Sequence, residues 1–262
     1  MDSVVQELIK KEDIMYTYVT GYQMHEAVLK AMKMLDYGKV VEGENQDKIE
    51  QLKEIQLVMD VANIQDLTMS KAFPTDLYGL VEYELEFIEG VRDFEPEWEY
   101  TYHRLFAPYL PKCIEELKRE KDSRRAGLPI AGELSYGNPH PPCLQNIIFK
   151  ISKNRLNTTA FFRSNDGVKA FQMNSFAIAR LAQYIAKEVG VDVGSYTHIA
   201  NSFHAYRNDW IMLHKYVKML SQNNQYYTLD EYLETYDEYA DEYRRKCKSR
   251  KQELINRKII KE

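Results

Sequence analysis

Residues 142–210 contain the pattern that most constrains how this chain can fold. Four segments in this stretch switch between the alternating pattern of a strand and the longer repeat of a helix. They are strands at 144–151 and 156–162, a helix at 174–189 and a strand at 193–204. A polar turn at 152–155 separates the first two strands, and Gly190 ends the helix. This alternation predicts a sheet flanked by helices.

The rest of the chain adds helices and strands in irregular order. Periodicity predicts helices at 23–34, 75–89, 108–121 and 208–220 and strands at 55–61 and 128–131, and residues 1–15 fit a short helix. Irregular alternation favours a mixed α/β or α+β fold. The C-terminal segment is acidic up to Glu242 and basic from Arg244 to Lys251. We therefore expect a main domain of residues 1–222 and a charged helical extension of residues 223–262.

Composition excludes several classes of protein. With 262 residues, 44% of them hydrophobic, the chain can bury one large core. The net charge of −5 leads us to expect no nucleic-acid partner, and no apolar run approaches the roughly 18 residues of a membrane helix. The N-terminal segment lacks a signal-peptide pattern, and the three cysteines are widely spaced, so we expect the cytoplasm. The spacing of cysteines and histidines predicts no metal site.

Cys143 is the first candidate for chemistry. It follows the proline-rich segment 138–142, which is unsuited to regular structure and delivers the cysteine to the start of a strand. A thiolate is a strong nucleophile, and nearby arginines favour the ionised form. A lone cysteine is more often a small buried hydrophobe, so Cys143 needs the support of its neighbours.

The intervals around Cys143 supply that support. Arg163 lies 20 residues after Cys143, Asn174 follows 11 residues later, and His204 follows after a further 30. Together with Pro142-Cys143-Leu144-Gln145, Arg163-Ser164-Asn165-Asp166 and the upstream Ser123-Arg124-Arg125, this pattern resembles the thymidylate synthase and pyrimidine-nucleotide hydroxymethylase superfamily. The resemblance implies a thymidylate-synthase-like catalytic domain with a mixed β-sheet flanked by helices. It covers residues 100–210 best and weakens on both sides.

The resemblance implies a reaction on a pyrimidine nucleoside monophosphate. In that family a thiolate, here Cys143, adds to C6 of the ring and makes C5 nucleophilic toward a one-carbon unit. Asn174 matches the residue that reads the ring, since its amide can donate to O4 and accept from N3–H of uracil. An aspartate in that place would suit cytosine better, so Asn174 favours a uridylate, with dUMP as the expected substrate. Alone, an asparagine that opens a helix is most often a cap.

Other matched residues imply nucleotide binding and a homodimer with shared active sites. Arg163 and Ser164 occupy the phosphate site, and Arg124 and Arg125 match a pair that reaches the phosphate of the neighbouring subunit. Guanidinium groups suit phosphate because they bind its oxygens bidentately. Two further matches, His204 and Tyr206, would bind the sugar hydroxyl, and their alternation along a strand predicts that they share a face.

The resemblance also implies a reduced-folate cofactor, 5,10-methylenetetrahydrofolate or a related reduced pterin. Asp166 matches the carboxylate that holds the pterin ring, and Ala170 lies close to it. Tyr102 resembles the active-site tyrosine of the family. Glu84 resembles the glutamate that relays protons, with a one-residue slip against Gly90; alone, it would be a solvated helix residue.

Several departures from the family pattern place the chain nearer to the archaeal and phage branches. Leu144 stands where histidine is common, Ala170 where glycine is common, and Trp98 is the single indole near the usual tryptophan pair. The charged segment 257–262 replaces an apolar lid. A methyl-forming enzyme must keep water from its intermediate, whereas a hydroxymethylase must admit water.

Three functions therefore compete. The first is methylation of dUMP to dTMP, which we favour slightly because the reaction is common in the family. The second is hydroxymethylation of deoxyuridylate. The third is a non-catalytic, nucleotide-binding regulator, which would have no use for the nucleophile Cys143. A partner that docks on residues 228–262 is compatible with each.

Overall fold

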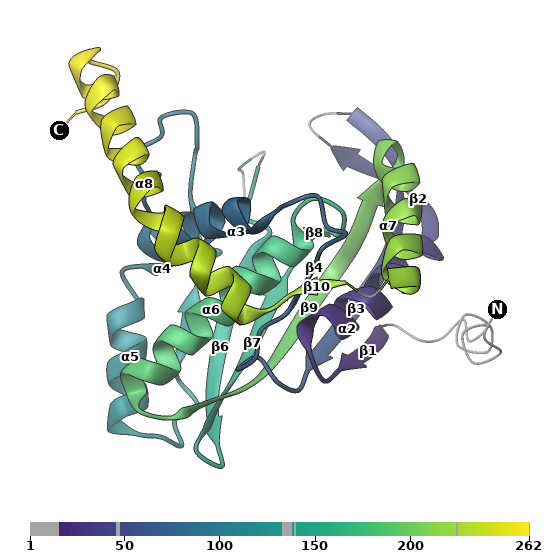
Figure 1. Ribbon diagram of the computed structural model, residues 1–262, viewed down its shortest axis with the longest axis horizontal. Coiled ribbons are helices and arrows are strands. Elements are labelled where there is room, and N and C mark those ends of the chain that lie inside the picture. Colours follow the sequence, from purple (N-terminus) through teal and green to yellow (C-terminus); the bar gives the residue numbers. More distant parts are fainter. Residues whose placement is uncertain (1–15, 46–47, 133–137, 139, 224, 262) are drawn as a thin grey trace.

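The computed structural model describes residues 16–45, 48–132, 138, 140–223 and 225–261, so the short helix expected at 1–15 lies outside the described residues (Figure 1). The strands are β1 (Thr17–Gly21), β2 (Lys39–Asn45), β3 (Lys48–Val61), β4 (Met69–Ser70), β5 (Gly127–Pro129), β6 (Leu144–Ser152), β7 (Arg155–Phe162), β8 (Asn165–Asp166), β9 (Asp192–Tyr206) and β10 (Tyr226–Tyr227). The α-helices are α2 (Met24–Asp36), α3 (Leu77–Glu84), α4 (Tyr102–Phe106), α5 (Leu110–Arg119), α6 (Phe171–Val189), α7 (Trp210–Asn223) and α8 (Leu229–Asn256). A π-helical turn, η1 (Leu85–Glu89), extends α3, and a 3-10 turn, η3 (Arg207–Asp209), precedes α7.

One mixed sheet organises the molecule. Within the described residues its eight strands run in the order β1-β3-β9-β7-β6-β5, with β2 beside β3 and β8 beside β9. The central strand β9 pairs antiparallel with β3 and parallel with β7. The short strands β4 and β10 form a second, two-stranded sheet. The expected mixed α/β fold, a sheet flanked by helices, is confirmed.

The β6–β7 hairpin and helix α6 form where the sequence predicts them. Lys153 and Asn154 have φ angles of 50° and 57°, which makes the turn that joins β6 to β7. Gly190 ends α6 with a φ of 75°, a left-handed conformation that glycine adopts without a Cβ penalty. The residues that α6 buries include the predicted inward set Ile178, Leu181, Ala182 and Ile185.

Helices α2 and α6 cover one face of the sheet, on which the strand residues are buried (Figure 1). Burial alternates along β7 and along β6 after its first residues, so every second side chain there points to the other face. Apolar side chains there stay partly exposed: Tyr18 is 61% exposed and Ile148 is 50% exposed. Hydrogen bonds from Tyr18 and Thr197 to Asp60 link β1, β9 and β3 across this face.

Helix α8 crosses the other helices and extends away from the sheet (Figure 1). It begins at the cap residue Thr228, and it buries Tyr232, Ala240, Tyr243 and Cys247 in the same core as the sheet. Hydrogen bonds join its tyrosines to acidic residues of α3 and η1. The pairs are Tyr232 with Glu84 at 2.7 Å, Tyr239 with Glu82 at 2.6 Å and Tyr243 with Glu86 at 2.6 Å. The division of the chain at residue 222 stays a prediction.

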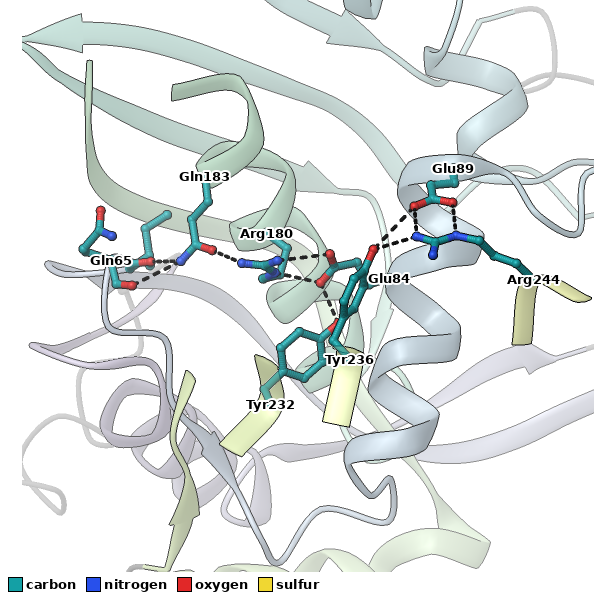
Figure 2. A network of polar contacts seen from close by, with 9 residues as sticks. Gln65, Glu84, Glu89, Arg180, Gln183, Tyr232, Tyr236 and Arg244 are labelled. Carbon is teal, nitrogen blue, oxygen red and sulfur yellow. Dashed lines mark hydrogen bonds and ion pairs between the residues drawn. The ribbon is translucent and has the colours of Figure 1, made fainter. Parts of the chain in front are cut away.

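Figure 2 shows the buried part of this contact. The Arg180 guanidinium of α6 donates to Glu84 of α3 at 2.7 Å and 3.3 Å, and the Tyr232 hydroxyl donates to the same carboxylate. Gln183 binds Arg180 and also donates to the main-chain oxygens of residues 64 and 65. Side chains of α3, α6 and α8 are therefore hydrogen-bonded to one another at the buried Glu84 carboxylate.

Replacing Tyr232 with phenylalanine should destabilise the protein by about 1–3 kcal/mol, because a buried carboxylate loses one of its donors. Tyr239→Phe is the matched control: its hydroxyl binds Glu82 in a partly exposed place where water can substitute, so we expect a change within about 0.5 kcal/mol. The free energy of unfolding in urea measures both changes. Equal effects of the two substitutions would contradict this ranking.

Candidate active site

Cys143 lies immediately before β6, at the end of the proline-rich segment. The pairing of β6 with β7 shifts register between Leu144 and Asn146, so the strand bulges right after the cysteine. The Gln145 amide donates to the Pro142 carbonyl at 2.7 Å, and the Arg163 main-chain N–H donates to the Cys143 carbonyl at 2.9 Å. These bonds fix the main chain of the cysteine against the end of β7.

Arg163 lies beside the thiol. Its guanidinium donates to the carbonyls of Pro142 at 3.0 Å and Pro141 at 2.6 Å, and Nη2 lies 3.8 Å from Cys143 Sγ. Burial raises the pKa of Cys143 above its ordinary value, and the Arg163 charge partly offsets that rise. The thiol is therefore protonated in the free protein at neutral pH, next to a cation that favours the thiolate.

Three tyrosines surround the other side of the cysteine. The Tyr102 hydroxyl accepts from the Leu144 main-chain N–H at 3.4 Å, and Tyr100 packs against Tyr102 at 6.0 Å between ring centroids. Tyr83 reaches the same group from α3. Burial raises the pKa of all three hydroxyls, that of Tyr100 to about 12. They are neutral at physiological pH and can donate hydrogen bonds.

Asn174 stands in the first turn of α6 and is only 5% exposed. The Tyr83 hydroxyl donates to Asn174 Oδ1 at 2.5 Å. This bond brings the predicted base-reading residue into the group of tyrosines that borders Cys143. The structure thus assembles Cys143, Arg163, Tyr102 and Asn174 from four separate elements.

Ser164, Asp166, His204 and Tyr206 form the next part of the site. The short strand β8 pairs Asp166 with His204 of β9. The Ser164 hydroxyl lies 3.4 Å from His204 Nδ1, and the rings of His204 and Tyr206 meet edge to face at 5.0 Å, so both residues share a face as predicted. Burial lowers the pKa of His204, which keeps the ring neutral and able to hydrogen-bond in either sense.

Asp166 also shapes the entry to α6. One of its carboxylate oxygens accepts from the main-chain N–H groups of Val168 and Lys169, each at 2.9 Å. Ala170, which directly precedes α6, donates its main-chain N–H to the Asp166 carbonyl at 3.2 Å. Asp166 and Ala170 are thus held together next to the helix that carries Asn174.

The structure does not bring Arg124 and Arg125 to Cys143 of the same chain. Both side chains are exposed, and they line a surface pocket of about 290 Å³ between α5 and β5. Ser123 anchors this segment by donating to Glu116 at 2.6 Å. Any role for the arginine pair at the phosphate therefore requires a second copy of the chain.

Glu84 is not part of the cysteine group either. Its carboxylate binds Arg180 and Tyr232 (Figure 2), and it lines a separate cavity of about 490 Å³ that also contacts Tyr236 of α8. A proton-relaying role beside Cys143 does not fit this placement. Its neighbour Tyr83 lies on the side of α3 that lines the cysteine group instead.

An aromatic cavity of about 370 Å³ adjoins the cysteine group. Its walls are Tyr83, Glu86, Phe87, Arg92, Trp98, Tyr100, Thr101 and Tyr102. The Arg92 guanidinium lies over the Trp98 ring at 4.2 Å and forms an ion pair with Glu86 at 3.3 Å. Sequence reasoning missed Tyr83 and Arg92, because the sequence alone gives no signal that ranks them above the other polar residues in and after α3.

The described residues contain neither a metal site nor a membrane-spanning helix. Among them, no group of three or more histidine, cysteine, aspartate or glutamate side chains is arranged to hold a metal ion. No helix in the described ranges is long and apolar enough to cross a membrane. All three cysteines are free thiols.

Comparisons with known proteins agree with this geometry. The thymidylate synthase family model matches residues 92–243. The "Putative thymidylate synthase" of Methanocaldococcus jannaschii is 33% identical over 189 residues, which cover 66% of this chain and 83% of that protein. A deoxyuridylate hydroxymethyltransferase of Pseudomonas phage M6 is 32% identical over 140 residues, covering 48% of this chain and 40% of that protein.

A solved structure shows the same fold. Thermostable thymidylate synthase A from Bacillus subtilis superposes with a TM-score of 0.60 at 14% identity, over 75% of this chain and 84% of that one. The chain therefore belongs to the thymidylate synthase family. The resemblance of the segment around Cys143 to that family is confirmed, as is the relation to archaeal and phage members.

Alkylation of Cys143 by iodoacetamide should rise with pH and reach its midpoint above about 8.5, the ordinary pKa of a cysteine, because burial disfavours the thiolate. Arg163→Gln should move the midpoint higher still, since it removes the cation that stabilises the thiolate. Arg155→Gln, at the far end of β7, is the control and should leave the midpoint unchanged. Peptide mass analysis across pH measures the midpoints; a lower midpoint in Arg163→Gln would contradict the assignment.

Proposed function

We propose that this protein transfers a one-carbon unit from 5,10-methylenetetrahydrofolate, or a related reduced pterin, to C5 of dUMP and yields dTMP. One observation carries the proposal. Arg163, which suits a phosphate, lies beside the Cys143 thiol, and Asn174, which suits a pyrimidine ring, is hydrogen-bonded to Tyr83 in the same group of residues. A nucleotide that spans these two side chains places its ring beside the thiol.

Cys143 would act as the nucleophile. Its thiolate adds to C6 of the uracil ring, which places negative charge on C5 and O4 and makes C5 reactive. Arg163 stabilises the thiolate and binds the phosphate, so substrate binding and nucleophile activation share one cation. The reaction requires a reduced thiol, which supports a cytoplasmic location.

The remaining polar residues would position the nucleotide. Asn174 donates to O4 and accepts from N3–H of the ring. His204 and Tyr206 share the face of β9 next to Ser164 and suit the sugar hydroxyl. The neutral hydroxyl of Tyr102 can stabilise charge that develops on the ring without a cost in reorganisation.

The aromatic cavity beside the cysteine fits a reduced pterin. Its indole, phenol and phenyl walls suit a flat heteroaromatic ring, and the Asp166 carboxylate has the acceptor chemistry that the ring N–H groups need. When bound, the reduced pterin would supply the one-carbon unit and, for methyl formation, the hydride that reduces this unit, so that the pterin itself would be oxidised. Glu86 is the carboxylate that lines this cavity, so we propose Glu86 rather than Glu84 for proton transfer at the site.

Hydroxymethylation of deoxyuridylate is the second candidate, and one observation favours it. Polar hydroxyl groups of Tyr83, Tyr100 and Thr101 line the cavity that would have to exclude water for methyl formation. The phage hydroxymethyltransferase is also among the relatives of this chain. Both candidates use Cys143 and Asn174 in the same way and differ only in the fate of the one-carbon unit.

Incubation with dUMP and methylenetetrahydrofolate, followed by mass analysis of the nucleotide, tests the proposal. We expect a product heavier than dUMP by one methyl group in exchange for hydrogen, whereas a hydroxymethyl gain would establish the second candidate. Cys143→Ser should bind dUMP yet lose turnover by a factor of about 10⁴ or more, because a serine hydroxyl is a far weaker nucleophile at neutral pH. An unchanged nucleotide with the wild-type protein would leave the regulator as the remaining function.

We further propose that the active protein is a homodimer with shared sites. The partly exposed apolar face of the sheet offers a contact surface, and Arg124 and Arg125 are too far from the thiol of their own chain to contact it. In the dimer this pair would complete the phosphate site of the partner. Each phosphate would then be bound by cations from two chains.

Subunit mixing tests the shared site. Arg125→Ala and Cys143→Ser should each be poorly active as pure homodimers, the first mainly through a higher KM. In mixed dimers, one site receives both lesions and the other receives neither, so activity should recover to about half of wild type per heterodimer. Arg119→Ala, also in the α5–β5 surface pocket, is the control partner. Verified heterodimers without recovery, or an active monomer, would contradict the proposal.

A further inference from the structure

Tyr83 and Asn174 form the contact that extends the functional assignment. The Tyr83 hydroxyl comes from α3 and donates to Asn174 Oδ1 on α6 at 2.5 Å. Asn174 is almost fully buried, and the Tyr83 ring packs against Phe87 one helical turn further on. Among the described residues, the Tyr83 hydroxyl has Asn174 Oδ1 as its hydrogen-bond acceptor. The contact is therefore held from both helices, and its Asn174 side is almost fully buried.

The two ends of the Asn174 amide differ in what they can recognise. Uracil presents an acceptor at position 4 and a donor at N3, whereas cytosine presents a donor at position 4 and an acceptor at N3. A half-turn of the amide about its Cβ–Cγ bond exchanges the oxygen with the NH₂ group. One orientation thus reads uracil, and the reversed orientation reads cytosine, with the same side chain in the same place.

We propose that Tyr83 is a positioning residue that sets the base preference of the enzyme by holding the Asn174 amide in its uracil-reading orientation. With the oxygen bound to Tyr83, the second lone pair of Oδ1 remains for N3–H, and the NH₂ group faces position 4. The inference rests on the proposed function for the identity of the substrate. Tyr83 is not among the residues by which the sequence around Cys143 resembles the family.

The cost of reversing the amide gives the size of the effect. After reversal the NH₂ group faces Tyr83, and the buried O–H loses its acceptor. Burial keeps this hydroxyl protonated by raising its pKa, so the donor stays in need of a partner. An unsatisfied buried donor disfavours the reversed state by about tenfold or more, and removal of the hydroxyl abolishes that penalty.

The test compares the equilibrium binding of dUMP and dCMP by calorimetry. We expect Tyr83→Phe to reduce the dUMP preference, the ratio of the two Kd values, by about tenfold. Tyr100→Phe removes another buried hydroxyl from the same cavity without touching Asn174 and should leave the ratio unchanged. A general loosening of the site would weaken the binding of dUMP and dCMP by the same factor and leave the ratio of their Kd values unchanged. A changed ratio therefore indicates that Tyr83 positions the Asn174 amide.

Asn174→Asp supplies the second arm. The two carboxylate oxygens are equivalent, so a half-turn changes nothing, and adding Tyr83→Phe to this variant should leave its ratio constant. A ratio that is unchanged in Tyr83→Phe alone, or that shifts equally in the Asn174→Asp background, overturns the inference.

Binding also separates this inference from the proposed function. If wild type prefers dUMP but forms no product, the reaction fails while the role of Tyr83 is decided by the ratios. If wild type forms product and the ratio does not respond to Tyr83→Phe, the reaction stands and the inference fails. A wild-type protein that binds neither nucleotide contradicts both.

Discussion

The buried ion pair between Glu84 and Arg180 is the interaction on which the rest of this structure depends. A charged pair away from water is stable only when its remaining hydrogen bonds are made, and here Tyr232 and Gln183 make them. The pair also fixes α3 against α6. Because Tyr83 precedes Glu84 and Asn174 lies six residues before Arg180, the same helix–helix contact brings Tyr83 and Asn174 together at the active site.

The C-terminal helix therefore contributes to an active site that it does not enter. Tyrosines of α8 bind Glu82, Glu84 and Glu86, three acidic residues of α3 and η1. Without these donors the acidic residues would repel one another or turn toward solvent. The charged C-terminal helix thus supports the helix that lines the aromatic cavity.

How much the sequence could predict depends on the range of the interactions. The β6–β7 pair and helix α6 followed from local periodicity, and the group of Cys143, Arg163 and Asn174 followed from the resemblance of their intervals to the family pattern. The orientation of α3 did not, because acidic and aromatic residues occupy all its sides and the choice among them is made by α8, about 150 residues later. The sequence therefore pointed to Glu84, and it did not single out Tyr83. In the proposed homodimer, the destination of Arg124 and Arg125 would depend on a second chain, which one sequence does not place.

In the proposed reaction, Cys143 activates C5 of a uridylate. Release of tritium from dUMP labelled at C5, in the presence of methylenetetrahydrofolate, measures loss of that C–H bond whether the product carries a methyl or a hydroxymethyl group. We expect one tritium released for each nucleotide converted by wild type, and none above background with Cys143→Ala. Product that retains the label, or release that persists in Cys143→Ala, would contradict it.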